Sequence, residues 1–146
     1  MLADLTPDQR AKLARGWVWQ EGHLPDRCKA RITIVEPEGD ICVDDPERDY
    51  WFAKDELVPD LTDPATADGL LRTARAITGI PSLVAVMVGP GRDGRARWAL
   101  QRMVWDHGAE YQLLTATRWG GLGIPMMWES EPAALLAAIL AAPEAA

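Results

Sequence analysis

The chain holds few of the residue types that usually mark a metal site, a catalytic centre or an exported protein. Its 146 residues include two cysteines, two histidines, two tyrosines and one phenylalanine. No apolar run approaches the roughly 18 residues of a membrane-spanning helix. The first fifteen residues lack the basic-then-apolar order of a secretory signal, and without export the thiols are expected to stay reduced. These absences predict a soluble protein of the cytoplasm.

The potential metal ligands do not follow a known pattern. The soft ligands of the zinc type are His23, Cys28, Cys42 and His107. Their spacing lacks the tight pairs of zinc modules, and the cysteines are expected to be small apolar residues near a hairpin. The oxygen ligands that a hard cation prefers are Asp40, Asp44, Asp45 and Asp49. They lack the alternation and the closing glutamate of a calcium loop, so we predict no metal and no cofactor.

Acidic residues are plentiful and confined to one stretch. Between Glu36 and Asp68 there are twelve acidic residues against Arg48 and Lys54, a local charge of −10 in a protein of net charge −7. Like charges cannot be buried together, so this stretch must face water or a cationic partner. A sequence pI near 4.8 argues against direct binding of nucleic acid or of an anionic membrane.

The pattern of caps and apolar residues predicts an α+β fold. Three helices with capping residues are expected over Pro7–Arg15, from Pro64 to Gly79 and from Ser130 to Pro143. A hairpin of 31–35 and 41–43 and an extended piece at 49–53 are expected before the second helix. After it we expect a strand at 83–88, a long strand at 95–105, another at 111–117 and a short one at 126–128.

The length fits one compact domain. We predict a single domain with an antiparallel-rich sheet and helices packed on it, an α/β sandwich. Within it, residues 1–30 form a peripheral helix and an irregular segment, 31–68 the acidic hairpin and extended segment, and 69–142 a helix, a strand meander and the C-terminal helix.

From Trp51 to Ala142 the sequence resembles small uncharacterised proteins of bacteriophage and prophage genomes. The resemblance lies in the segment Leu57–Thr66, which leads into a capped helix, in the strand meander, and in the helix that Ser130–Ala133 opens. It implies a phage α/β/α sandwich domain that acts by binding host machinery. It supplies no catalytic residues.

The acidic stretch is the leading candidate for a binding surface. Seven tryptophans dominate the aromatic residues, and one or two are expected to lie exposed as interface anchors. The predicted partner-binding residues are Glu36, Glu38, Asp40, Asp44, Asp45, Glu47, Asp49, Trp51 and Trp119. Carboxylates spaced along a hairpin would imitate the phosphates of a nucleic acid. The alternative is a solvated acidic face that aids solubility.

Two other classes of function stay open. A small hydrolase-like enzyme would use Asp106 and His107 as an acid/base pair, with Ser82, Ser130 or Cys42 as nucleophile, but no nucleophile elbow or phosphate-binding loop accompanies them. A virion component or homo-oligomer would use a cationic hairpin tip against the acidic stretch of a second copy. The tip holds Arg92, Arg95, Arg97 and Arg102.

The sequence thus favours a non-enzymatic, phage-type accessory protein that binds its target stoichiometrically. The expected partner is a host or phage protein with a basic surface, such as a nucleic-acid-binding complex. The chain would inhibit a host nucleic-acid-processing complex as an anti-CRISPR-like protein or nucleic-acid mimic. Direct nucleic-acid binding and membrane binding are not expected, and a homodimer is allowed.

Overall fold

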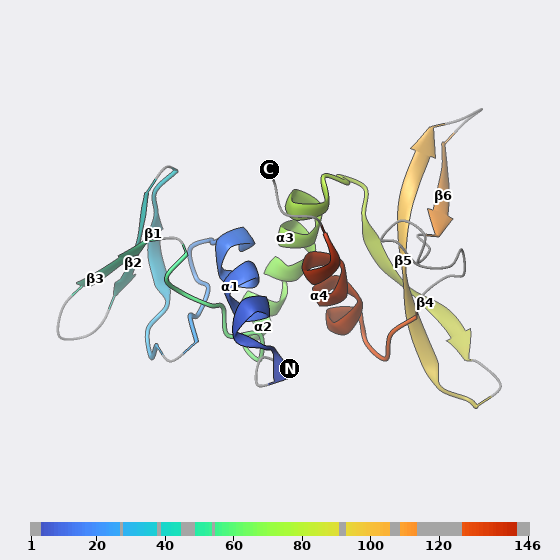
Figure 1. Cartoon of the computed structure of the whole chain (residues 1–146), viewed down its shortest axis with the longest axis horizontal. Helices are drawn as coiled ribbons and strands as arrows, with labels where there is room; N and C mark the ends of the chain where they lie inside the picture. The colour runs from blue at the N-terminus through green and yellow to red at the C-terminus, as the bar shows by residue number, and fades with distance from the viewer. Residues whose placement is uncertain are drawn as a thin grey trace. The chain divides into compact units, whose positions relative to one another are not determined.

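A computed structural model describes most of the chain, and Figure 1 shows its elements. The described residues are 4–26, 28–37, 39–44, 49–53, 55–90, 93–105, 109–113 and 127–142. The chain divides into two compact units, Met1–Thr73 and Ala74–Ala146. Each unit contains one three-stranded antiparallel sheet, with strand orders β1-β2-β3 and β4-β5-β6. The α+β class is confirmed, with its strands in two sheets where the sequence suggested one.

The first helix, α1 (Pro7–Gly16), begins at the capping box expected for it. The Thr6 hydroxyl accepts from the backbone N–H of Gln9 at 3.2 Å, and the Gln9 side chain accepts from the N–H of Thr6 at 3.0 Å. These bonds satisfy two of the donors that a helix start leaves unpaired. Leu13 and Ala14 are its buried residues, and Trp17 leaves the helix with extended backbone angles.

The second expected helix is interrupted near its start. It consists of α2 (Pro64–Ala67) and α3 (Gly69–Thr78), separated by a turn at Asp68. Asp63 caps α2 by accepting from the N–H of Thr66, and Gly79 follows α3 with a φ of 69°. A positive φ is accessible to glycine without steric cost, which explains the residue at this helix end.

In the first unit, the predicted hairpin is β1 (Ile32–Val35) and β2 (Asp40–Asp44), and β3 (Asp49–Ala53) pairs with the far side of β2. The register is regular between β2 and β3, with Cys42 opposite Trp51. A bulge lies between Ile32 and Ile34 on β1. The central strand of this sheet, β2, begins and ends with an aspartate, Asp40 and Asp44.

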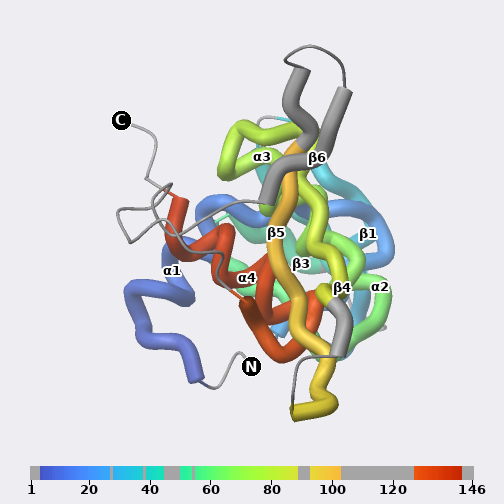
Figure 2. Tube along the Cα trace, turned by 90° about the vertical axis from the view of Figure 1, so that its right-hand side faces the viewer, coloured from blue at the N-terminus to red at the C-terminus, as the bar shows by residue number. Residues whose placement is uncertain are grey.

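In the second unit, β4 (Val84–Pro90), β5 (Ala96–Trp105) and β6 (Ala109–Leu113) form the meander, and α4 (Glu131–Ala141) contacts β4 and β5 (Figure 2). Ser130 caps α4 by accepting from the N–H of Ala133 at 3.2 Å, as expected. The short strand expected at 126–128 is a single bridge, in which Trp128 pairs with Trp98. No helix among the described residues has the length and apolarity to cross a membrane.

Candidate protein-binding surface

The β1–β2–β3 sheet has one buried face. Residues that pair across antiparallel strands point to the same face, and successive residues point to opposite faces. Ile41 and Val43 on β2 therefore share a face with Ile32, and all three are at most 3% exposed. Tyr50 and Phe52, which pair with Val43 and Ile41, lie on this face too, with ring centroids 6.5 Å apart.

The opposite face carries apolar side chains in contact with water. The bulge between Ile32 and Ile34 places Ile34 on this opposite face, where it forms one cross-strand row with Cys42 and Trp51. The outer two are 45% and 49% exposed, whereas Cys42 between them is 1% exposed. Because the Cys42 thiol is buried, it has no access to a substrate, and the role of nucleophile considered for it finds no support in this geometry.

Carboxylates lie on the same face as this row. Asp40 and Asp44 are two residues before and after Cys42, and both are exposed. We call this surface, made of Ile34, Asp40, Cys42, Asp44 and Trp51, the Trp51 face. Glu36 is exposed directly after β1, and its N–H donates to the carbonyl of Asp40 at 3.1 Å. Asp40, Asp44 and Trp51 of this surface are predicted contact residues, whereas Ile34 and Cys42 were not named as such.

Of the remaining predicted contact residues, the structure describes only some. The backbone of Asp49 pairs with Asp44 at the end of β3. Glu38, Asp45, Glu47 and Trp119 lie outside the described residues. So do Asp106 and His107, the acid/base pair considered for an enzyme.

The two units differ in net charge. Residues 1–73 contain sixteen acidic and nine basic residues, a net charge of −7, whereas residues 74–146 contain six of each. The entire net charge of the protein therefore belongs to the unit that carries the Trp51 face.

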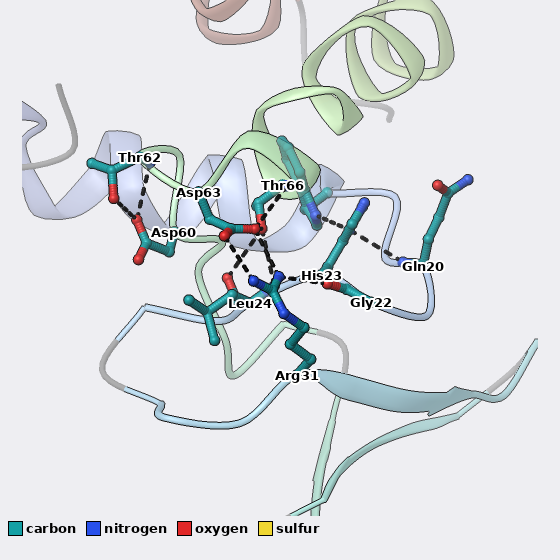
Figure 3. Close-up of polar contacts among 10 residues, drawn as sticks. Gln20, Gly22, His23, Leu24, Arg31, Asp60, Thr62, Asp63 and Thr66 are labelled. Atoms are coloured by element: carbon teal, nitrogen blue, oxygen red, sulfur yellow. Dashed lines mark hydrogen bonds and ion pairs between the residues drawn. The ribbon is translucent and has the colours of Figure 1, made fainter.

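Two aspartates of the acidic stretch are bound within the fold. Asp63 pairs with Arg31 through both carboxylate oxygens, at 2.9 and 3.0 Å, and the Arg31 guanidinium also donates to the carbonyl of Gly22 (Figure 3). The hydrogen bonds from Arg31 lower the pKa of Asp63 to about 2. Asp60 accepts from the N–H of Thr62 at 2.9 Å. These carboxylates hold loops together, which makes them poor candidates for binding a partner.

A buried histidine organises the segment that precedes the sheet, and the sequence analysis did not predict its role. His23 is 4% exposed and lies beside the rings of Trp17 and Trp19, with centroids 5.9 and 6.2 Å away. Its Nδ1 is the acceptor for the Trp17 indole N–H at 3.4 Å and the Gln20 N–H at 3.3 Å. Burial, with help from Arg72, lowers the pKa of His23, while Asp63 and Asp68 oppose that shift.

Threonines and a glycine connect this segment to the helices. Thr66 exchanges hydrogen bonds with the backbone of Leu24, and Thr73 accepts from the N–H of Val18 at 3.0 Å. At Gly69 the helix approaches the rings so closely that a Cβ would lie 2.7 Å from Trp17 and 2.9 Å from His23. Such contacts are invisible in a sequence because they join residues more than forty positions apart.

The first unit also contains an open cavity of about 420 Å³. Its lining residues are Arg10, Asp26, Cys28, Phe52, Glu56, Leu57 and Val58. Arg10 and Asp26 form an ion pair there at 2.9 Å. Burial, and to a lesser extent Asp26, raises the pKa of the Cys28 thiol, so this thiol is protonated at neutral pH and is a weak nucleophile.

The described residues offer no metal centre. Cys28 and Cys42 are both free cysteines. In the part of the chain that the structure describes, no three side chains of His, Cys, Asp or Glu converge in a way that could hold a metal ion.

Comparison with protein-family models, with curated proteins and with solved structures finds no match for this chain. The resemblance to phage α/β/α sandwich proteins therefore stays a prediction from the sequence. Proposals about function therefore rest on the geometry and charge of the chain itself and on that predicted resemblance.

Proposed function

We propose that this chain is a binding protein that uses the Trp51 face to engage a protein with a basic surface. The observation that carries the proposal is the half-exposed indole of Trp51, next to the exposed carboxylates of Asp40 and Asp44 on one face of a sheet. Exposed tryptophan is costly to leave in water and is enriched at the energetic centres of interfaces. Carboxylates around such an anchor favour a cationic partner and repel acidic ones.

The kind of partner follows from charge. A unit of net charge −7 repels nucleic acids and anionic membranes, but it complements proteins whose grooves hold them. We therefore propose a nucleic-acid-processing protein as the target, with the acidic sheet occupying its basic groove. In this role the chain inhibits its target by occupying the site, and no reaction of its own is needed.

The setting we propose is the cytosol of a bacterium that carries a phage or prophage. It rests on the resemblance of Trp51–Ala142 to phage α/β/α sandwich proteins. An inhibitor of host nucleic-acid processing, of the anti-CRISPR type among others, is the activity that fits both this setting and the acidic surface.

Affinity capture from a bacterial lysate tests the proposal. The captured proteins are identified, and the binding of each to the chain is then measured with purified proteins. The informative variant reverses two charges of the Trp51 face, Asp40→Lys with Asp44→Lys. Its control reverses two exposed carboxylates elsewhere, Glu21→Lys with Glu129→Lys, which changes the net charge by the same amount. We expect the native chain and the control to retain a nucleic-acid-binding protein, and the Asp40/Asp44 variant to lose it.

Salt and competition complete the test. Binding through charge should weaken steeply as salt is added, and duplex DNA should displace the chain from its target. Equal retention of the target by both variants, or a target without a basic surface, would refute the proposal. A second copy of this chain as sole partner, detected by sedimentation, would refute it as well and would identify a homo-oligomer instead.

A further inference from the structure

Trp51 lies between two carboxylates on the surface of the sheet. It is directly opposite Cys42, and Asp40 and Asp44 are the residues two positions away on that neighbouring strand. Such diagonal neighbours on one face of an antiparallel pair are about 7–8 Å apart, which is within reach of long side chains. A cation held over the indole therefore has a carboxylate on either side.

Small residues border the indole on its own sheet. Asp40 is opposite Ala53, which lies two residues after Trp51 on the same face, and Cys42 is directly opposite the tryptophan. Neither Ala53 nor Cys42 has a side chain large enough to cover the ring. This agrees with the 49% exposure of Trp51 and leaves its aromatic surface open to a ligand.

The chemistry of this arrangement distinguishes between the two cationic side chains. A guanidinium is planar and weakly hydrated, so it can stack on an indole and still donate in its own plane to a carboxylate. An ammonium is compact and strongly hydrated, and it gains less from an aromatic surface. Two carboxylates beside one exposed tryptophan are thus better suited to arginine than to lysine.

We propose that the Trp51 face selects arginine side chains of its partner, with the guanidinium stacked on Trp51 and hydrogen-bonded to Asp40 or Asp44. This inference rests on the proposed function, because it concerns the same face, and it adds the residue type that is recognised. The preferred target is then a basic surface rich in arginine, such as one that grips nucleic-acid phosphates, in place of a lysine-rich one.

Two peptides of equal charge, nona-arginine and nona-lysine, test the selection. Their affinities for the full chain are measured by fluorescence anisotropy at one fixed, low ionic strength. We expect nona-arginine to bind about two- to fivefold more tightly, the range that a cation–π contact at an exposed site supplies. Trp51→Leu should reduce that preference to nearly one while it changes nona-lysine binding little. Met87→Leu, which alters an exposed residue of the other unit, should leave both affinities unchanged.

Two further variants distinguish the loss of a specific contact from misfolding. Trp51→Phe keeps an aromatic ring with a weaker face and should give an intermediate preference, with an unfolding midpoint near that of the native chain. Asp40→Asn with Asp44→Asn should weaken binding of both peptides.

The outcomes separate this inference from the proposed function. Equal binding of the two peptides by the native chain, or a preference that survives Trp51→Leu, overturns arginine selection and leaves an acidic binding surface in place. If neither peptide binds, or if the Asp40/Asp44 asparagine variant binds both as tightly as the native chain, the proposed cationic partner is overturned together with the selection.

Discussion

The two sheets of this protein share an architecture and differ in what they present to solvent. Both have three antiparallel strands with buried residues on the middle strand, Ile41 on β2 and Leu100 on β5. The unit around β1–β2–β3 has a net charge of −7, whereas the unit around β4–β5–β6 is neutral. One fold class thus accommodates both charge states. A three-stranded antiparallel sheet therefore does not require the acidity of the first unit.

Substitution of large apolar residues on the middle strands should have the largest effect on stability. Ile41 and Leu100 are each fully buried, so Ile41→Ala and Leu100→Ala should each lower the free energy of unfolding by about 2–5 kcal/mol. Urea unfolding measures both. Ile34→Ala, on the Trp51 face of the first sheet, should cost below ~1 kcal/mol, because that side chain is 45% exposed. A cost equal to that of Ile41→Ala would mean that the Trp51 face is covered.

A close approach in the first unit should make one helix glycine irreplaceable. Gly69→Ala places a Cβ 2.7 Å from the ring of Trp17, and overpacking of this kind costs about 1–3 kcal/mol. Glycine to alanine inside an ordinary helix has the opposite sign. The double variant with Trp17→Phe should cost less than the sum of the two single variants, because the smaller ring leaves room. A gain in stability from Gly69→Ala alone would contradict this packing.

Mild acid should weaken the first unit through His23. Its pKa is lowered in the folded state, so the unfolded chain takes up the proton more readily. Stability is therefore complete above the ordinary histidine pKa of 6.5 and falls as the pH decreases below it. The unfolding midpoint should fall as the pH decreases through this range, both in the native chain and in His107→Gln, which replaces the only other histidine. It should fall less in His23→Gln. An equal slope in His23→Gln would exclude this origin.

The smallest expected difference concerns one exposed ion pair in each unit. Arg31 pairs with Asp63 through two bonds, whereas Arg97 pairs with Asp93 only four residues away. Asp63, with a pKa of about 2 against an ordinary 3.8, adds stability above 3.8 that is lost as the pH falls towards 2. Arg31→Ala should lower the thermal midpoint at neutral pH more than Arg97→Ala does, and it should flatten this acid-dependent loss. Equal shifts would mean that the first pair contributes no more than a local contact.

Local signals in the sequence were sufficient to predict the helix starts and the first hairpin. Thr6, Asp63 and Ser130 cap helices as expected, because a cap depends on neighbours three residues away. The hairpin at β1–β2 also depends on nearby residues and was predicted. The interruption at Asp68 was not, since it accompanies the approach of Gly69 to Trp17 and His23, which is a long-range contact.

The sequence by itself determined the α+β class, the helix caps and the concentration of acidic charge, because each depends on composition or on residues close along the chain. Tertiary structure alone decided where individual carboxylates of that stretch lie. It commits Asp63 to Arg31 within the fold, and it places Asp40 and Asp44 beside an exposed Trp51. Strand register brings Asp40, Asp44 and Trp51 together, since a shift by one residue between β2 and β3 would place Trp51 on the face opposite the two aspartates.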